Sequence, residues 1–500
     1  MVKEAFDNPE IERNLLYRLR PKTFILTLIF TAAFCAFMLL VTFLNNHSYY
    51  YGYYNDNGLE LFQFYTAFAL MLGYSYALLA AAFSIIREKT NKTYDFLYMV
   101  PMSDAKITVG KLIGSTIHMW FILGIVTPFI TFAAVRSYTP IGLYNFFLFY
   151  LILISGCVLC ASIGLLFSVG VAPKSSLIVV SGNIIVLGSA LAGLIAGFAR
   201  TGNQFIAILT PTTFLERFDQ PSALTTADFF GFSIDNGILT VILYAWFSFW
   251  IIRAVIRRVR NPYGTYLKPL EALGFFAGLE VLLAGTHWNT FALHSRLWES
   301  FSFYLLFNGL VLLMMILLMT VPRDTYLDYV RGILTKKPSG FMDIKSPPHI
   351  LMLLLCLILL IGFYGITNSR GLSLNYATDA YLSIWILVVF LYIFYLLVQL
   401  CKTFFIYSGF FAAVLIICAA SIIPMIIIGV FRMPEKYILY FNPIIYIVEM
   451  HSNYYHYRYY RDFDYFGPPV ALTVVLAVML VIFILRHYQI ENKVARRMGE

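Results

Sequence analysis

The sequence predicts an all-α protein that crosses a membrane about twelve times. Of its 500 residues, 60% are hydrophobic and 12% are charged, whereas soluble domains carry about 25% charged residues. The hydrophobic residues gather in runs long enough for membrane-spanning helices of about 20 residues. The basic residues are concentrated in alternate connections between these runs. The same composition excludes a disordered chain, a collagen-like rod and a secreted disulfide scaffold.

Each apolar run predicts a helix, because lipid offers no partner for exposed backbone N–H and C=O groups. The predicted spans are residues 23–44, 61–86, 112–135, 144–171, 176–199, 238–256, 271–288, 301–321, 350–366, 381–400, 405–431 and 468–485. The run at 271–288 is short and contains Glu280. That run either crosses the membrane or dips into its interface.

Charge predicts the orientation of the spans, since Lys and Arg concentrate in cytoplasmic connections. With the N-terminus inside, the cytoplasmic segments carry 26 of the 35 basic residues and the outer segments carry 9. One missed span would invert every later connection, so a bias that persists to the C-terminus supports an even number of spans. Both termini are therefore expected in the cytoplasm. The net charge of +9 then reflects topology rather than nucleic-acid binding.

Short motifs that flank the spans recur in the same order half a chain later. The matches are Asn8-Pro9 with Asn261-Pro262, Arg87-Glu88 with Arg323-Asp324, and Thr210-Pro211 with Asn442-Pro443. Duplicated transporters show such collinear repeats. Prolines are also common near helix ends, so chance placement is the alternative. A duplication predicts two parallel six-helix halves, residues 1–258 and 259–500.

The N-terminal segment predicts an amphipathic helix. Asn8 can cap the free N–H groups, and Pro9 suits the first helical position. From Ile11 to Leu19 the apolar residues share one face and the arginines lie elsewhere. This pattern is typical of a helix that lies on the inner membrane surface. A cytoplasmic extension of the first span is the alternative.

The connection over residues 87–111 combines a short apolar helix with a sharp stop. The apolar stretch from Phe96 to Val100 precedes Pro101, which ends a helix. Ser103 is placed to cap the next helix. A solvated loop needs no exposed apolar side chains, so we expect this loop to contact a protein partner or the bilayer.

This loop resembles the cytoplasmic loop of ABC-2 type permeases, the membrane subunits of ATP-binding-cassette exporters. Lys92 stands where that pattern has glycine, and Asp95 where it has a second glutamate. The second-half loop at 322–348 keeps only an acid and a proline of the pattern. The residues that match are Glu88, Thr93, Asp95, Leu97, Pro101, Ser103, Ile107, Gly110 and Lys111. The resemblance implies that this set, apart from Ile107, couples the chain to an ATPase.

The resemblance further implies an ABC-2 permease fold similar to that of type V exporters, with both halves of one transport unit in one chain. No Walker A motif occurs in the sequence. ATP and Mg²⁺ are therefore expected on a separate ATPase subunit, in two copies. This chain is expected to bind no cofactor or metal and to catalyse no reaction. Membrane lipid is its other expected partner, and the bacterial cytoplasmic membrane is its expected location. The expected direction of transport is outward. A homodimer is the less favoured assembly.

Two outer segments, 209–216 and 441–449, are similar to the re-entrant segment of the same family. The outer-gate residues implied by this resemblance are Pro211, Phe214, Glu216, Pro443, Tyr446 and Glu449. Glu280 is the one acid well inside a predicted span, where a carboxylate costs about 2.5–3.5 kcal/mol unless it faces a cavity or is protonated. It is a candidate contact for substrate or a proton.

Other polar residues of the spans have simpler interpretations. His118, Asn183 and Asn308 are typical of side chains that form hydrogen bonds between helices. Cys157 and Cys160 form a C-x-x-C pair inside an apolar run, which favours small packing residues over a metal or redox site.

Two other functions stay open. An ion-coupled secondary transporter would use Glu280 as its coupling carboxylate. A membrane enzyme acting on lipid-linked substrates is suggested by the tyrosine-rich outer segments 47–57 and 451–465, although an aromatic belt at the headgroups explains them too. Carbohydrate or metal binding by His451, His456 and the tyrosines is the third interpretation of these segments.

Overall fold

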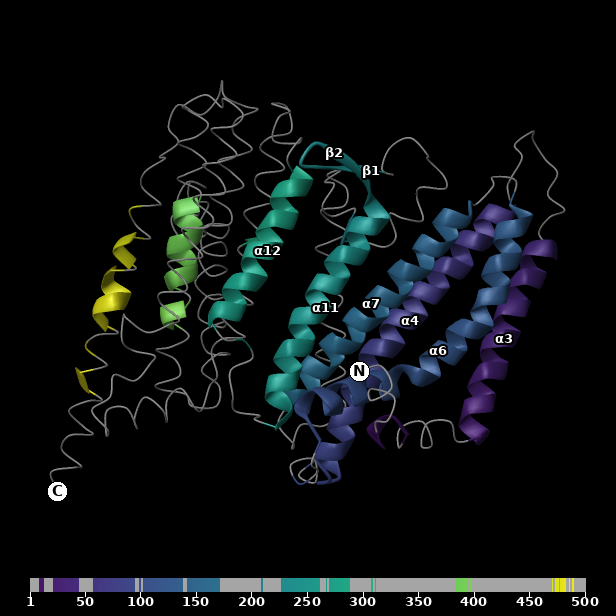
Figure 1. Ribbon diagram of the computed structural model, residues 1–500, viewed down its shortest axis with the longest axis horizontal. Helices are drawn as coiled ribbons and strands as arrows, with labels where there is room; N and C mark the ends of the chain where they lie inside the picture. Colours follow the sequence, from purple (N-terminus) through teal and green to yellow (C-terminus); the bar gives the residue numbers. More distant parts are fainter. Residues whose placement is uncertain are drawn as a thin grey trace, which may run out of the picture. The chain divides into compact units, whose positions relative to one another are not determined.

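The computed structural model describes residues 9–12, 21–44, 57–94, 99, 102–137, 142–170, 208–209, 226–260, 267 and 269–287, with short stretches between 307 and 489. The chain divides into two compact units, Met1–Pro262 and Tyr263–Glu500. Most described residues are helical (Figure 1). The spans predicted over 176–199, 350–366 and 405–431 lie outside the described residues.

Five helices of the first unit are long and apolar enough to cross a membrane. They are α3 (Pro21–Leu44), α4 (Asn57–Thr90), α6 (Asp104–Arg136), α7 (Leu143–Gly170) and α11 (Asn236–Arg260). Each coincides with a predicted span, so these five helices are confirmed. The 34 residues of α4 and the 33 of α6 extend these helices to about 50 Å. Both exceed a hydrocarbon core of about 30 Å.

Local sequence explains where two of these helices begin. Ser103 has extended backbone angles, φ −69° and ψ 149°, and its side chain accepts the Lys106 N–H at 3.3 Å. Asp235 precedes α11 and accepts the Gly237 N–H at 2.8 Å. Both side chains satisfy donors that the first helical turn leaves free. The predicted cap at Ser103 is therefore confirmed.

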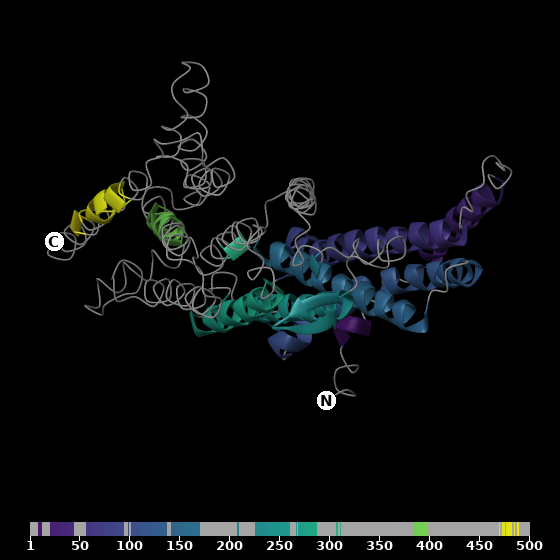
Figure 2. The same ribbon diagram turned by 90° about the horizontal axis from the view of Figure 1, so that it is seen from above.

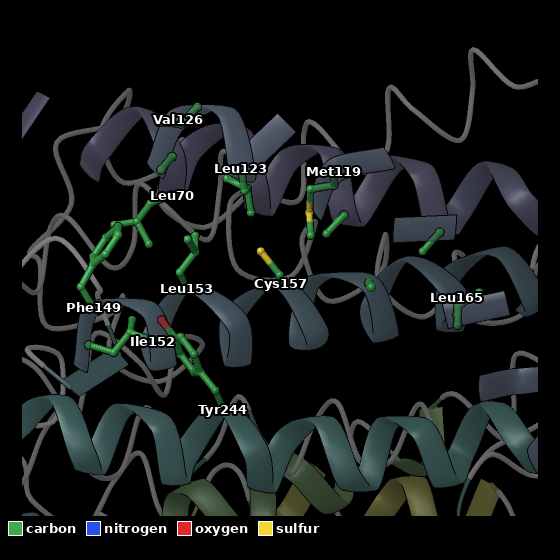
Figure 3. Close-up of a cluster of buried hydrophobic side chains, with 14 of the residues drawn as sticks. Leu70, Met119, Leu123, Val126, Phe149, Ile152, Leu153, Cys157, Leu165 and Tyr244 are labelled. Atoms are coloured by element: carbon green, nitrogen blue, oxygen red, sulfur yellow. The ribbon is translucent and has the colours of Figure 1, made fainter. Parts of the chain in front are cut away.

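Helix α4 is the centre of the first unit. It packs along α6 and α7, α11 packs against α7, and α3 lies against α6. The view from above shows α7 between α4 and α11 (Figure 2). The core interleaves side chains such as Leu70 of α4, Leu123 of α6 and Leu153 of α7 (Figure 3). Helix α3 is peripheral, because only 11% of its most apolar stretch is buried, against 33% or more of the same stretch in the other four helices.

Small residues allow α4 and α7 to approach closely. A Cβ atom at Gly164 would clash with the backbone oxygen of Leu78. A Cβ atom at Gly73 would lie 3.1 Å from the Cys157 sulfur, which occupies the space beside that glycine. Cys157 is buried in the core (Figure 3). It therefore acts as a small packing residue between these two helices.

A two-stranded hairpin, which the sequence did not predict, precedes α11 in the mostly helical described residues. Strands β1 (Thr226–Phe229) and β2 (Phe232–Asp235) pair antiparallel, with Thr226 opposite Asp235. The turn residues Phe230 and Gly231 have φ angles of 50° and 89°, as a two-residue hairpin turn requires. Its four-residue strands are too short to stand out in the sequence beside the long apolar runs.

In the second unit, α12 (Pro269–His287) occupies the run predicted over 271–288. Among the described helices, α12 is not one of the five that are long and apolar enough to cross a membrane. Glu280 on this helix is buried, with 9% of its surface exposed. The runs predicted at 301–321, 381–400 and 468–485 are described only in short helical stretches. Twelve spans and two repeats therefore stay predictions.

Candidate functional site

Polar contacts gather at one end of the first unit, where α4, α7 and α11 end and α6 begins. We call this end the Lys111 end, after its central residue. Lys111 lies in the second turn of α6 and is 1% exposed. Its Nζ atom donates to Glu88 Oε2 at 2.6 Å and to Glu10 Oε1 at 3.0 Å. This Lys111 triad joins the last turn of α4, the start of α6 and the N-terminal stretch at 9–12.

Burial makes the triad difficult to break. The Glu10 and Glu88 side chains are 6% and 13% exposed. Breaking a buried ion pair costs about 3–5 kcal/mol, and Lys111 is the partner that both carboxylates share. Removing Lys111 would leave two carboxylates facing each other. The triad therefore holds the three segments in one arrangement.

The N-terminal stretch contacts the helix bundle through Glu10. Glu10 and Ile11 are buried, while Pro9 and Glu12 are exposed. Ile11 thus lies on the buried face, as the amphipathic pattern predicts. The described helix covers residues 9–12, and the rest of the predicted helix lies outside the described residues. The contact of Glu10 with Lys111 was not part of the predicted coupling set.

The chain leaves α4 through a residue with left-handed backbone geometry. Lys92 has a φ angle of 56°. The Glu88 carbonyl accepts the N–H groups of Thr93 at 2.9 Å and of Tyr94 at 3.2 Å. The Thr93 hydroxyl donates to the same carbonyl at 3.3 Å. These contacts form a helix C-cap, in which glycine is the favoured left-handed residue.

Two further side chains bind the ends of neighbouring helices. Lys89 Nζ donates to the carbonyl oxygens of Ser168 at 2.9 Å and Val169 at 2.8 Å, in the last turn of α7. The Tyr94 hydroxyl donates to the Val259 carbonyl at 2.6 Å, in the last turn of α11. The Lys89 ammonium also lies 5.4 Å from the centre of the Tyr94 ring. A helix leaves these last carbonyls without intrahelical partners.

The structure brings part of the predicted coupling set together. Glu88 and Lys111 form an ion pair, Thr93 belongs to the C-cap of α4, Ser103 caps α6, and Gly110 is buried. Lys89 and Tyr94 also lie at this end, but they were not among the predicted coupling residues. The predicted site residues outside the described stretches are Asp95, Leu97, Pro101, Pro211, Phe214, Glu216, Pro443, Tyr446 and Glu449.

A second polar cluster lies farther along the bundle, at His118. Its Nε2 atom lies 2.9 Å from the Thr27 hydroxyl of α3, and its Nδ1 atom lies 2.9 Å from the Tyr76 hydroxyl of α4. The Thr27 hydroxyl proton is donated to the Phe24 carbonyl at 2.8 Å. Each ring nitrogen of His118 pairs with one hydroxyl group. His118 thus forms hydrogen bonds between three helices, as its sequence context predicts.

The contacts at the Lys111 end connect segments that are far apart in the sequence. Within the described residues, no group of three or more His, Cys, Asp or Glu side chains could hold a metal ion. The contacts at the Lys111 end join five segments: the N-terminal stretch, α4, α6, α7 and α11. Such an arrangement can transmit a displacement from one segment to the others.

Comparison with known proteins identifies one relationship. Residues 22–257 match the family described as ABC-2 family transporter protein. This match covers α4, α6 and α7 completely and the whole connection 87–111. No curated protein and no solved structure matches the chain.

Proposed function

Because residues 22–257 match the family described as ABC-2 family transporter protein, we propose that this chain is an ABC-2 type permease that exports a substrate from the bacterial cytoplasm with energy from a separate ATPase subunit. ATP and Mg²⁺ bind to that subunit, of which two copies dock on the cytoplasmic side. Both chain termini and the loop 87–111 face the cytoplasm. The chain itself supplies the pathway and catalyses no reaction.

The Lys111 triad is the observation that carries this proposal. It fixes both ends of the loop 87–111, because Glu88 belongs to α4 and Lys111 to α6. Between these ends Met99 is 79% exposed, so the loop presents an apolar side chain that a protein partner can cover. A force on a loop with fixed ends moves both helices with it. This supports the loop as the place where the ATPase acts.

In the proposed mechanism, closure of the two ATPase subunits pushes the loop 87–111. The triad passes this motion to α4 and α6, which are long rigid helices. Their tilt against the second half opens the outer gate formed by Pro211, Phe214 and Glu216 with Pro443, Tyr446 and Glu449. Each helix thus acts as a lever between the cytoplasmic and outer faces.

Co-purification tests the partnership directly. The tagged full-length chain, solubilised from its native membrane, is expected to bring down a subunit that contains a Walker A motif and hydrolyses ATP. Isolation of the chain without such a subunit, together with uptake driven by an ion gradient in liposomes, would overturn the proposal. That result would favour the ion-coupled alternative, with Glu280 as its coupling carboxylate.

A double substitution, Glu88→Gln with Leu97→Ala, tests the role of the loop. Nitroxide labels at Leu40 of α3 and Val135 of α6, which are 54% and 82% exposed, report the opposite end of the bundle. We expect ATP to change the distance between the labels in the otherwise wild-type complex. The double variant should insert and hydrolyse ATP without this change.

Glu60 offers a matched control for this double variant. It is an exposed acid in the first turn of α4, at the opposite end from Glu88. Glu60→Gln removes one negative charge from the same helix and is expected to keep the full ATP-dependent distance change. A full change in the Glu88→Gln, Leu97→Ala variant as well would remove the loop from the mechanism.

A further inference from the structure

The segment that follows α4 closes the ends of two other helices. Lys89 binds the last-turn carbonyls of α7, and Tyr94 binds a last-turn carbonyl of α11. These contacts span 79 to 165 positions in the sequence. Neither of them involves the Lys111 triad. They are therefore a second set of connections from the same short segment.

Burial makes both connections specific. Ser168 is fully buried, and Val169 and Val259 are 2% and 1% exposed. The Tyr94 side chain that reaches α11 is itself buried. Water has little access to these carbonyls, so a donor from the protein must satisfy them. The Lys89 ammonium also suits the negative end of the α7 dipole.

At the Lys111 end, the described contacts join four helices of the bundle to one another. The segment 87–94 contacts α6 through Glu88, α7 through Lys89 and α11 through Tyr94. Helix α3 is joined to the bundle elsewhere, by hydrogen bonds from His118 and Tyr65. A displacement of 87–94 therefore acts directly on three helices besides α4.

We infer that Lys89 and Tyr94 are positioning residues that make α7 and α11 move together with α4 and α6 when the loop 87–111 is displaced. This inference rests on the proposed function, because the displacement comes from the ATPase. It adds that the moving body contains four helices rather than two. Helix α3 serves as the reference against which this body moves.

Distance measurements between α3 and the two capped helices test the inference. Nitroxide labels are placed at Ile25 of α3 and at Arg253 of α11 in one sample, and at Ile25 and Ile154 of α7 in another. All three positions are exposed. In the complex with its ATPase, we expect ATP to shift both distances. Tyr94→Phe removes one hydroxyl and should lose mainly the α11 shift.

Lys89 is tested in the same way on α7. Lys89→Met keeps the length of the side chain but removes its donors and charge, so the α7 shift should be lost. Lys89→Arg keeps a cationic donor and should restore this shift. Rescue by arginine together with loss by methionine separates the hydrogen bonds from simple packing.

Tyr65→Phe is the matched control for Tyr94→Phe. The Tyr65 hydroxyl donates to the Cys35 carbonyl at 2.8 Å and is fully buried, but it joins α4 to α3. The two variants lose the same chemical group and the same kind of bond. Tyr65→Phe should keep the α7 and α11 shifts, so equal loss in both variants would reduce the effect to general destabilisation and overturn the inference.

The outcomes separate this inference from the proposed function. If ATP moves α6 relative to α3 in the otherwise wild-type complex but shifts neither α7 nor α11, the four-helix body is overturned and the ATP-driven mechanism stands. Absence of the α6 movement as well would contradict that mechanism. Shifts in the wild type that persist fully in Tyr94→Phe and Lys89→Met would leave the mechanism standing and overturn the four-helix body.

Discussion

Lys92 occupies a backbone conformation that suits glycine better than lysine. Its φ angle is 56° and its side chain is exposed. In the ABC-2 loop pattern, glycine stands at this position, and the C-cap geometry of α4 supplies the physical reason. A side chain with a Cβ atom in the left-handed region costs about 1–2 kcal/mol.

Lys92→Gly is therefore expected to stabilise the protein. The removed strain outweighs the larger conformational entropy that glycine gives the unfolded chain, for a net gain of about 0.5–1 kcal/mol. Denaturant unfolding of the full chain in detergent micelles measures this difference. Lys92→Ala retains a Cβ atom and should give no such gain; an equal gain from alanine would assign the effect to the lysine side chain instead.

The cap at Ser103 could be predicted from the sequence because this residue directly precedes the helix that it caps. Glu88 and Lys111 lie in one loop motif and form an ion pair, while their role in coupling to an ATPase stays a prediction. The contacts of Glu10, Lys89 and Tyr94 join positions 79 to 165 residues apart. No periodicity or spacing in a single sequence encodes such pairs, because they arise from helix packing.

At the scale of elements, the membrane makes helices easy to predict and their contacts difficult. Each long helix of the first unit coincides with an apolar run because lipid requires both features. The hairpin at 226–235 lacks that signal. The close approach of α4 and α7 at Gly164 is equally invisible, since glycine also occurs where nothing is near. Gly124 is such a case, because a Cβ atom at this position would have no neighbour within 4 Å.

This contrast gives a paired prediction. Gly164→Ala places a Cβ atom against the backbone of Leu78 and forces α4 and α7 apart, which should cost about 1–3 kcal/mol. Gly124→Ala meets no atom and should add stability of up to about 1 kcal/mol, because alanine is the better helix former. Unfolding measurements of both variants decide the matter. Equal effects at the two positions would contradict the close packing.

At the scale of the whole molecule, topology remains a prediction that depends on charge. Helices α7 and α11 both end at the Lys111 end, as expected if the run at 176–199 crosses between them, and the even count extends over runs outside the described residues. What the sequence could predict here is orientation, because basic residues report it directly. The packing of helices between the two halves has no comparable signal in the sequence.

Thiol labelling tests this orientation. In a background without the six native cysteines, Phe232→Cys in the hairpin should react with a membrane-impermeant maleimide added outside cells. Met99→Cys should react only in inverted vesicles. Both positions are well exposed, at 73% and 79%, so access depends on the side of the membrane. The reverse pattern would place the N-terminus outside.

The ion pair between Glu10 and Lys111 also imposes an order on biogenesis. Its partners are 101 positions apart, and ribosomes add about 5–20 residues per second. Glu10 therefore emerges roughly 5–20 s before the lysine that neutralises it. During this interval α3 and α4 must enter the membrane while the acid stays hydrated. The N-terminal stretch can take its final place only after the third helix has begun to emerge, so the triad cannot close before synthesis of the third span has started.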